Sequence, residues 1–539
     1  MECKSISASD LPHTSLLYST FLNEFSKVSD YYAHPPTVDA VLHAARELSF
    51  DKDMRGAVAE ILRRQNLLFG GDDATARNIE RLNNGALAVV TGQQVGLLGG
   101  PAYSVYKALT AIHLANDLTA KGVNAVPVFW LATEDHDLEE VNHVFLAKRG
   151  ALERFDLAST GAEGRRVGEI PLGSQAREIS SRAGEFLEGS GRDQVAQWIA
   201  ESYRPEETFG SSFAKLMTRI FAGRGLILLD PLSSELHRLS APVMLAAVNE
   251  HKALARQLVA QSAALEKAGY HAQVKVTEES TLAFRIVEGK RISLRPVNGG
   301  FAAGNKRESA DETLQAIKLH PEEFSPNALL RPVIQDALLP TVAYIGGPAE
   351  IAYHAQASVI YKKLLGRTPV ILPRAAFTLV PAHVANLLRK YNLDAQDVFA
   401  GRQQLRAKME AEALPSELTA RFDEGEKNLQ ESLGNLRHPL SKLDQTLLGA
   451  LDTVTEKILY QFNGLRAKAG RAEGFRSGVL NTHESEITNF LLPNNDLQER
   501  SLSILTFLAS EGPLLLDLLD RQITIGTGAH CVMTLQPTV

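Results

Sequence analysis

A cluster of ionisable side chains at residues 134–137 stands directly after a short apolar segment. Two of its carboxylates, Asp135 and Asp137, flank the imidazole of His136, whose ordinary pKa of about 6.5 suits proton transfer near neutral pH. We predict that His136 and Asp137, with Asp135 beside them, take a proton from an amine or position one. An Asp in this place also commonly caps a following helix, here predicted at 138–145, and that structural role stays open.

A second polar cluster follows the apolar residues 86–90 and is rich in glycine. Glycines free backbone N–H groups to point at a ligand, and a helix predicted at 103–118 begins just after them, so the segment favours an anion or a nucleotide. The glutamines add uncharged donors and acceptors, whereas Lys107 reaches either a carboxylate or phosphate or the solvent. The candidate binding residues of this cluster are Thr91, Gln93, Gln94, Gly96, Gly100, Pro101 and Lys107.

The elements that must position both clusters form a strand–helix–strand unit across residues 86–131. Its strands are short runs of small and β-branched residues without charge, which is typical of parallel strands buried on both faces. A right-handed crossover places both polar clusters at the carboxyl ends of neighbouring strands, where open α/β sheets bind ligands. Further strands predicted at 226–229, 340–345 and 369–372 complete an α/β fold with a Rossmann-like parallel sheet.

A third group of candidates surrounds the strand predicted at 340–345. Arg331 has a planar fork of donors that suits a carboxylate such as that of malate, and a structural salt bridge is the equal alternative. Glu350 either faces the same crevice or stabilises the start of the following helix. Trp130 is either a core residue or a stacking platform. The binding residues predicted in this group are Asn327, Arg331, Gln335, Gly347, Glu350 and Tyr353, with Trp130 from the earlier strand.

Other kinds of site find less support. The glycine-rich segment matches neither G-x-x-x-x-G-K-[ST] nor G-x-G-x-x-G, which argues against a P-loop and a standard dinucleotide fingerprint. His136, Glu140 and His143 would share one helical face, but no further ligand stands out, and we predict no metal centre. The only two cysteines, Cys3 and Cys531, lie at opposite ends of the chain, a usage that suits the reducing cytosol.

The composition narrows the class of partner. The chain has 539 residues with 56 Lys and Arg against 63 Asp and Glu, a net charge of −7, and no basic block, so nucleic acid is disfavoured. No apolar run reaches the roughly 20 residues that span a bilayer, and the first 20 residues do not resemble a leader. We therefore expect a cytoplasmic protein that binds neither nucleic acid nor membrane.

The length predicts more than one domain, because single cores rarely grow beyond about 250 to 300 residues. We predict a Rossmann-like core with an N-terminal cap at residues 1–375, which carries inserts at about 150–210 and 255–325. A helical connector at 376–415, a coiled coil at 416–475 and a segment at 476–539 that returns to the core follow it.

Two of these regions have distinctive patterns. Apolar residues recur at spacings of three and four from 418 to 465, which is typical of a coiled-coil seam for packing or dimerisation. Pro439 interrupts the seam, so a kinked helix or an antiparallel hairpin fits better than one straight helix. An antiparallel insert is predicted at 270–303, starting with a strand at 272–276, and a helix is predicted at 497–511.

These residues together resemble one known family, the bacillithiol biosynthesis cysteine-adding enzymes, also called BshC cysteine ligases. The order and spacing match across essentially the whole chain, including the late coiled coil. The segments that carry the resemblance are residues 89–97, Gly100-Pro101 with Lys107, residues 127–130 leading to 134–137, Arg331-Pro332, Gln335, Pro340-Thr341, and Gly347-Pro348 with Glu350, Ile351 and Tyr353.

The resemblance implies a Rossmann-like core related in shape to class I nucleotidyltransferases and a coiled coil that pairs two identical subunits. The implied reaction joins L-cysteine to the amine of glucosaminyl-malate and gives bacillithiol, as the last step in making this low-molecular-weight thiol. Because an amide does not form from an unactivated carboxylate, we expect ATP or another adenine nucleotide, with magnesium as its companion, to supply an acyl-adenylate or acyl-phosphate.

Within that reaction the loop from Gly96 to Pro101 would hold anionic oxygens, and Asp137 or His136 would deprotonate the amine. Arg331 or Lys107 would hold malate. Two other functions share these features: a nucleotidyltransferase that releases an adenylylated product, and a non-catalytic coiled-coil dimer that binds a metabolite and scaffolds other enzymes. The polar crevice favours catalysis over scaffolding but does not separate a ligase from a transferase.

Overall fold

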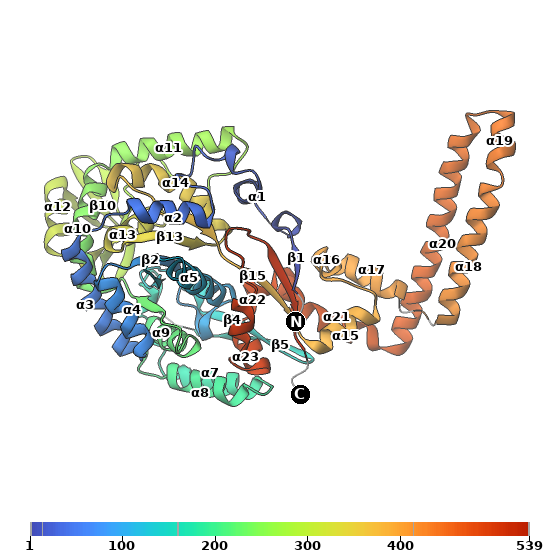
Figure 1. The fold of residues 1–539 in the computed structure, drawn as a ribbon, viewed down its shortest axis with the longest axis horizontal. Helices are drawn as coiled ribbons and strands as arrows, with labels where there is room; N and C mark the ends of the chain where they lie inside the picture. The colour runs from blue at the N-terminus through green and yellow to red at the C-terminus, as the bar shows by residue number, and fades with distance from the viewer. Residues whose placement is uncertain (1–2, 13, 159–160, 413, 415, 537–539) are drawn as a thin grey trace.

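The computed structural model describes residues 3–12, 14–158, 161–412, 414 and 416–536, which form an α/β body with a long helical arm (Figure 1). A five-stranded parallel sheet in the order β14-β13-β2-β3-β6 lies at the centre of the body. Its strands are β2 (Leu87–Gln93), β3 (Ala125–Leu131), β6 (Ile227–Leu229), β13 (Thr341–Gly346) and β14 (Val370–Pro373). The predicted Rossmann-like sheet is confirmed.

The strand–helix–strand unit predicted from the sequence is β2, α5 (Tyr103–Ala120) and β3. The two strands pair in parallel from Leu87 opposite Ala125 to Gln93 opposite Leu131. They carry no charged side chain and are buried along almost their whole length, because both have neighbours on each side and helices on each face. Both polar clusters therefore begin where adjacent central strands end.

Helices cover both faces of this sheet. On one face, α5 and α2 (Val38–Glu47) pack against β2, β13 and β14. The other face is covered by α3 (Lys52–Phe69), α4 (Asp73–Asn83), α10 (Ser234–Asn249), α13 (Arg331–Leu338) and α14 (Pro348–Leu364), with α1 (Leu16–Asn23) and α11 (His251–Lys267) farther out. Side chains of successive strand residues point to opposite faces of the sheet, which is the period-two alternation of a β-strand.

The first insert follows β3. It contains α6 (Leu138–Val141), the hairpin β4 (His143–Lys148) and β5 (Ala151–Asp156), and the helices α7 (Gln175–Phe186), α8 (Arg192–Ser202) and α9 (Phe209–Ile220). The prediction of a helix at 138–145 is wrong beyond Val141, because residues 143–148 form a strand that pairs with β5. His143 consequently does not share a helical face with His136 and Glu140.

The second insert is antiparallel, as predicted, and consists of β7 (Ala283–Val287), β8 (Lys290–Ser293), β9 (Arg295–Val297), β10 (Gly300–Ala303), β11 (Lys306–Ser309), α12 (Ala310–Leu319) and β12 (Phe324–Pro326). Its turn at Glu288-Gly289 has positive φ angles at both residues. The strand predicted at 272–276 is wrong: the segment forms no strand, and Val274 is instead held by hydrogen bonds to the side chain of Gln356.

The arm is a helical hairpin. After α15 (Ala382–Lys390), α16 (Ala395–Phe399) and α17 (Arg402–Glu412), the chain runs out along α18 (Ser416–Gly434), turns through α19 (Arg437–Leu443) and returns along α20 (Leu447–Ser477) (Figure 1). Pro439 lies in the first turn of α19, where its missing N–H costs no helical hydrogen bond. The hairpin alternative predicted from this proline is confirmed, and Phe422 packs edge to face on Phe462 across it.

The C-terminal segment returns to the body through α21 (Val479–Leu491), α22 (Gln498–Ser501), α23 (Leu505–Glu511) and α24 (Leu515–Asp520). The helix predicted at 497–511 is wrong as one piece, because Leu502 adopts an extended conformation between α22 and α23. The chain ends in β16 (His530–Thr534), which lies between β1 (Cys3–Ile6) and β15 (Ala376–Val380) in a second sheet. Cys3 and Cys531, 528 residues apart, are joined there by a disulfide that the sequence did not lead us to expect.

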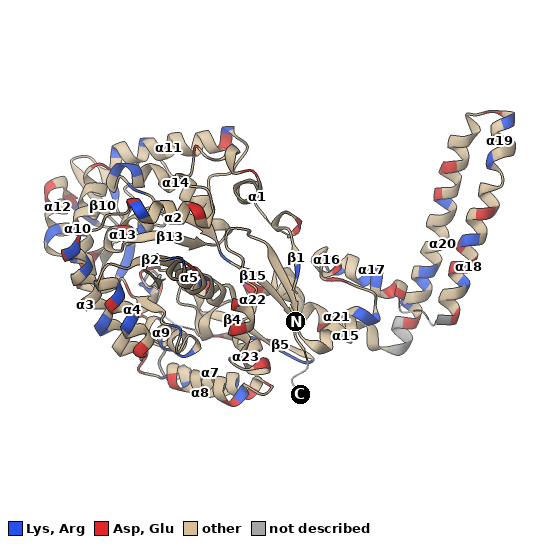
Figure 2. Cartoon of the chain, in the orientation of Figure 1, with Lys and Arg blue, Asp and Glu red and all other residues tan. Residues whose placement is uncertain are grey.

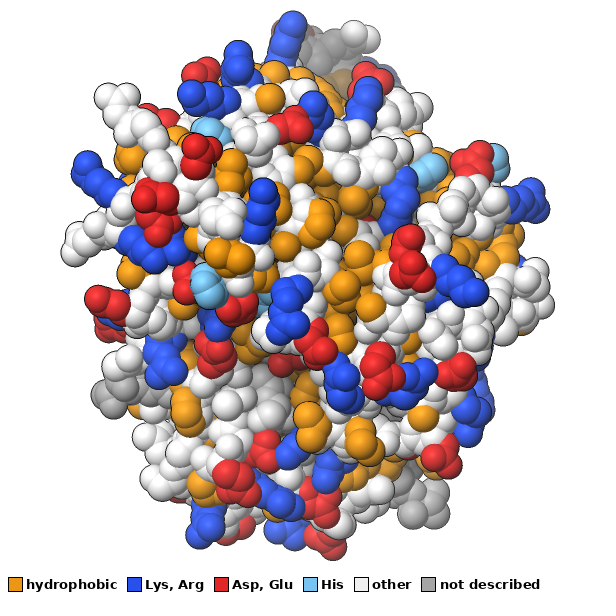
Figure 3. All heavy atoms as spheres, turned by 90° about the vertical axis from the view of Figure 1, so that its left-hand side faces the viewer, with side chains coloured by type: hydrophobic (Ala, Val, Ile, Leu, Met, Phe, Trp, Pro, Cys, Tyr) orange, Lys and Arg blue, Asp and Glu red, His pale blue; other side chains and the backbone are white. Residues whose placement is uncertain are grey.

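Charged residues are distributed over both the body and the arm (Figure 2). On the face of the body around α10, α11 and α12, basic and acidic side chains are interspersed (Figure 3). None of the described helices is long and apolar enough to cross a membrane.

Candidate active site

A cavity of about 610 Å³, here called the main cavity, opens at the carboxyl ends of the central strands. This volume is typical of a site for a small molecule. Three parts of the chain build its wall: the loops after β2, β3 and β13, the antiparallel insert, and the C-terminal segment. The predicted residues that line it are Gln93, Gln94, Lys107, Trp130, Asp135, Asn327, Arg331, Gly347, Glu350 and Tyr353.

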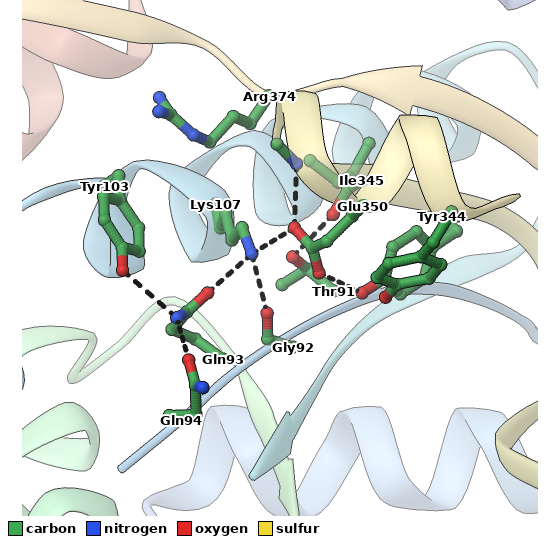
Figure 4. A network of polar contacts seen from close by, with 12 residues as sticks. Thr91, Gly92, Gln93, Gln94, Tyr103, Lys107, Tyr344, Ile345, Glu350 and Arg374 are labelled. Carbon is green, nitrogen blue, oxygen red and sulfur yellow. Dashed lines mark hydrogen bonds and ion pairs between the residues drawn. The ribbon is translucent and has the colours of Figure 1, made fainter. Parts of the chain in front are cut away.

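A buried ion pair between Lys107 and Glu350 lies at the centre of this wall (Figure 4). The Lys107 ammonium also donates to the Gly92 carbonyl at 3.0 Å and to Oε1 of Gln93 at 2.7 Å. Glu350 accepts from the Tyr344 hydroxyl at 2.5 Å and from the backbone N–H of Gly347 at 2.8 Å. The pair thereby ties α5 to the start of α14, and every hydrogen of the ammonium has an acceptor.

Burial and ion pairing shift the pKa values of Lys107 and Glu350 in opposite directions. Burial lowers the pKa of Lys107, and the carboxylate of Glu350 opposes that shift. Burial would raise the pKa of Glu350, but Lys107 and the hydrogen bond from Gly347 outweigh it and hold the pKa below its ordinary value. Because each charge compensates the other, removing one partner would leave a buried uncompensated charge.

Arg331 has a different environment although it lies nearby. Its guanidinium donates to the Tyr353 hydroxyl at 2.5 Å, and longer contacts reach Tyr344 at 3.5 Å and Oε1 of Gln335 at 3.4 Å. No carboxylate of the described residues lies within ion-pair distance of Arg331. Of the two roles left open by the sequence, a structural salt bridge is thus not formed, and the positive charge remains available to an anion entering the cavity.

Acidic side chains form the opposite wall. Gln94 donates to Asp135 at 3.2 Å and to Glu140 at 2.6 Å. Burial raises the pKa of Asp135, but hydrogen bonds from His136 and the charge of Arg291 outweigh it and hold this pKa well below its usual range. For Glu140, burial followed by the charges of Asp135 and Asp137 raises the pKa. Asp135 is therefore a persistent anion, while Glu140 is the better proton acceptor of the two.

The other two predicted acid–base residues lie outside the main cavity. His136 accepts a hydrogen bond from Arg291 at 2.9 Å and packs against Phe284. Asp137 is exposed and accepts from the backbone N–H of Glu140 at 3.2 Å, which makes it the N-cap of α6. The capping role that the sequence left open is confirmed for Asp137, and its part in catalysis stays a prediction.

The loop from Gly96 to Pro101 does not form the predicted anion site. Three of its backbone N–H groups already donate within the protein: Gly96 to the Gln94 carbonyl, Gly99 to the Tyr203 hydroxyl and Gly100 to the Leu97 carbonyl. At the start of α5, Ala102 donates to the Leu502 carbonyl. With these donors used, Gly96, Gly100 and Pro101 have a structural role beneath the cavity.

Two further predicted residues are core residues. The Thr91 hydroxyl donates to the Ile345 carbonyl at 2.8 Å and joins β2 to β13. Gln335 is fully buried and donates to Asp336 at 3.1 Å. Trp130 combines the two alternatives that the sequence left open, because it is only 1% exposed yet contributes to the cavity wall.

Sequence reasoning missed six polar or charged side chains of the cavity wall. These are Tyr103, Glu134, Glu140, Arg291, Arg374 and Arg500. Arg374 forms a buried two-point ion pair with Glu499, at 2.9 and 2.6 Å, and its guanidinium lies 5.5 Å from the centre of the Tyr103 ring. Arg291 and Arg500 come from distant segments, so no local pattern could assign them, whereas Glu134 and Glu140 belong to or closely follow the acidic cluster and could have been included.

No group of three or more His, Cys, Asp or Glu residues in the described part of the chain could hold a metal ion. A magnesium ion, if it takes part, would thus need ligands from a bound phosphate as well as from the protein.

Comparisons with known proteins place this fold and site in a family. The family model described as "Bacillithiol biosynthesis BshC, N-terminal Rossmann-like domain" matches residues 1–375, and "Bacillithiol biosynthesis BshC, C-terminal coiled-coil domain" matches residues 377–535. The chain belongs to the bacillithiol biosynthesis BshC family. Every wall residue of the main cavity except Arg500 lies in the span of the first model, so the second model's span completes the site.

Relatives in this BshC family are similar along nearly their whole length. A protein of Koribacter versatilis named "Putative cysteine ligase BshC" is 41% identical over 96% of both chains. Proteins of the same name from Solibacter usitatus and Chlorobaculum tepidum are 37% and 33% identical, over 95% and 97% of this chain and 96% and 94% of theirs. The resemblance drawn from the sequence is confirmed at the level of the family, and these names support a ligase.

Proposed function

We propose that this protein joins L-cysteine to the amine of glucosaminyl-malate and thereby forms bacillithiol. The observation that carries the proposal is the partly buried Arg331, which has tyrosine and glutamine partners but no described carboxylate partner in a cavity of ligand size. Malate supplies two carboxylates, and a guanidinium binds a carboxylate through two parallel hydrogen bonds. The family to which the chain belongs, and the names of its relatives, support this choice of substrates.

The substrates set the demands on the site. Cysteine brings an unactivated carboxylate and the sugar brings an amine that is protonated in neutral water, so the first must be activated and the second deprotonated. We propose that Glu140, whose pKa is raised by burial and by Asp135, accepts the proton from the amine. Asp135 stays anionic and attracts the ammonium form, and His136 holds Arg291 in place behind it.

ATP or another adenine nucleotide, with magnesium, would supply the activation of the carboxylate. Arg500 is the residue that we propose holds its phosphates. Arg500 fits this role because its half-exposed side chain has, among the described residues, only Asp496 within ion-pair distance, at 3.6 Å. The loop from Gly96 to Pro101 does not fit it, since its three glycine N–H groups are used within the fold and the loop does not line the main cavity.

We further propose that the arm pairs two copies of the chain. Large apolar side chains remain exposed along the hairpin, including Leu443 at 78% and Tyr460 at 76% exposure, and burying them against a second hairpin would stabilise a homodimer. The reaction would then take place in a cytoplasmic dimer. The arm projects from the body (Figure 1), and the residues that line the main cavity belong to the body.

Turnover is the experiment that tests this function. Purified protein is incubated with glucosaminyl-malate and L-cysteine, with and without ATP and magnesium, and the products are identified by mass spectrometry. Bacillithiol that forms only with ATP supports the ligase. An adenylylated product that accumulates instead would indicate a nucleotidyltransferase, and binding without any product would indicate a scaffold.

The assignment of Arg331 to malate is tested by Arg331→Lys. A lysine keeps the charge but loses the two-point geometry, so the KM for glucosaminyl-malate should rise by roughly a hundredfold or more, about 2–3 kcal/mol, while the KM for cysteine stays within about twofold. Arg367→Lys is the matched control, because Arg367 donates to the backbone outside the cavity. Equal effects on both KM values would argue against the assignment.

A further inference from the structure

A second, much smaller cavity adjoins the main cavity on the side of α10 and α13. This inner chamber has about 20 Å³ of free space. It shares Trp130, Glu134 and Pro326 with the wall of the main cavity. The rest of its wall is mostly apolar and includes Met244 and Ala241 from α10.

Trp130, which lines the inner chamber, has an unused hydrogen-bond donor. Trp130 is 1% exposed, and its indole N–H has no partner among the described residues. An unpaired buried N–H is costly, because it has lost water without gaining another acceptor. The donor therefore points to a group that is bound there when the protein works.

The carboxylate of Glu134 lines both cavities, and only one of its two oxygens is hydrogen-bonded to a described residue. Oε1 of Glu134 accepts from Nε2 of His237 at 2.9 Å, while Nδ1 of His237 donates to the Ser233 carbonyl at 3.0 Å. Burial alone lowers the pKa of His237, but the hydrogen bond and charge of Glu134 outweigh it and raise this pKa. The other oxygen of Glu134 makes no hydrogen bond within the described part of the chain, so it can accept one from a ligand in the main cavity.

The size of the chamber limits its occupant. A space of this size holds about one water-sized group, which excludes a sugar, a malate or a purine. It suits a side chain that extends one heavy atom beyond its Cβ atom. The apolar wall favours a soft, weakly hydrated atom such as sulfur over a hydroxyl, which would lose most of its hydrogen bonds.

We propose that the inner chamber is the side-chain subsite for a small amino acid, with the cysteine thiol beside the Trp130 N–H and the ammonium group of the same molecule on Glu134. The inference rests on the proposed function for the identity of the amino acid. It adds the means by which the protein selects cysteine, since larger side chains do not fit and alanine leaves the indole N–H unpaired.

The test fills the chamber without touching the main cavity. Ala241→Leu adds three carbon atoms inside the chamber, and Ala246→Leu, on the same helix but outside its wall, is the matched control. We expect Ala241→Leu to raise the KM for cysteine at least tenfold and to leave the KM for glucosaminyl-malate unchanged, whereas the control changes neither. Trp130→Phe removes only the N–H and part of the ring, and it should raise the KM for cysteine roughly two- to tenfold. This second variant still tests the subsite if Ala241→Leu does not fold.

Direct binding separates this inference from the proposed function. Calorimetric titration of the unaltered protein with L-cysteine under reducing conditions, followed by competition with L-2-aminobutyrate and L-leucine, does not depend on turnover. Binding of cysteine, weaker binding of aminobutyrate, which fits the chamber but leaves the indole N–H unpaired, and no binding of leucine would support the subsite even if no bacillithiol forms. Turnover with an unchanged KM for cysteine in both variants would overturn the subsite while leaving the ligase intact, and loss of both binding and turnover in the unaltered protein would overturn both.

Discussion

Two glycine-rich junctions, each joining a central strand to a helix, lie side by side in this fold and have opposite roles. The first, from Gly96 to Pro101 between β2 and α5, uses its backbone donors within the protein. The second, at Gly346-Gly347 between β13 and α14, borders the main cavity and is surrounded by Glu350, Lys107 and Arg374. Glycine at such a junction thus does not by itself identify an anion site; the use of the nearby N–H groups decides it.

The largest effect is expected from Lys107→Ala, which removes the charge beneath the second junction. Glu350 would remain buried without its partner, and the free energy of unfolding should fall by roughly 3–5 kcal/mol with loss of turnover. Urea denaturation and the turnover assay measure both. The double variant Lys107→Ala with Glu350→Gln is the control, because it should recover stability without recovering turnover. A stable and active single variant would contradict the central place of this pair.

The two junctions are compared directly by placing one methyl group in each. Gly100 has a φ of +66° and a ψ of −166°, so Gly100→Ala should lower stability by about 1–3 kcal/mol while the KM values of the folded protein stay the same. Gly347 has a φ of −82°, which alanine adopts without strain, and its added carbon would lie 3.6 Å from Nε of Arg374 and 3.8 Å from Cε of Lys107.

Gly347→Ala should therefore leave the stability of the protein unchanged but raise the KM for glucosaminyl-malate or for cysteine about tenfold. Thermal unfolding measures the stability of each variant, and steady-state kinetics measures its KM values. If Gly100→Ala impaired substrate binding and Gly347→Ala did not, the roles given to the two junctions would be reversed.

The helix that follows the second junction, α14, carries a buried, unprotonated histidine. His354 on α14 is buried among Tyr344, Tyr353 and Tyr361, and both ring nitrogens lack a partner in the described chain. Burial, and then the charge of Arg331, lowers its pKa to about 3.

Because the unfolded state binds this proton below pH 6.5 and the folded state does not, stability should fall as the pH drops from about 6.5 towards 3. The slope from this one group is up to about 1.4 kcal/mol per pH unit. His354→Phe should remove that part of the slope between pH 6.5 and pH 5, measured by urea denaturation at each pH. Identical slopes in the two proteins would show that folding does not lower the pKa of His354.

The smallest effect on turnover is expected at the two cysteines, which lie in the sheet of β1, β15 and β16 and outside both junctions. The substrate supplies the thiol of the product, so the enzyme needs none of its own. Replacing Cys3 and Cys531 with Ser should leave kcat within about twofold, whatever it does to the melting temperature. A large fall in kcat of the folded double variant would mean that this sheet controls the cavity.

Local patterns predicted the parts of this molecule that obey local rules. The uncharged, β-branched runs predicted the central strands, and Pro439 with the apolar spacing around it predicted the helical hairpin. The same reasoning failed where tertiary contacts override propensity: residues 143–148 form a strand because they pair with β5, and residue 502 is extended between two short helices.

The residues of the candidate site also divide into those that local patterns predicted and those that depend on tertiary contacts. Lys107, Arg331 and Glu350 could be found because they lie near strand ends, where ligands of such sheets bind. Arg291, Arg374 and Arg500 could not, since only the complete fold brings their three segments together. The use of the N–H groups between Gly96 and Pro101 was equally hidden, because one of their acceptors is the hydroxyl of Tyr203, more than 100 residues away.

The most direct measurement of the central claim is a crystal structure of the protein with glucosaminyl-malate. The account predicts that a malate carboxylate lies within hydrogen-bond distance of the Arg331 guanidinium, with the sugar amine facing Asp135 and Glu140 across the main cavity. Malate bound at the loop from Gly96 to Pro101, or outside the main cavity, would contradict it.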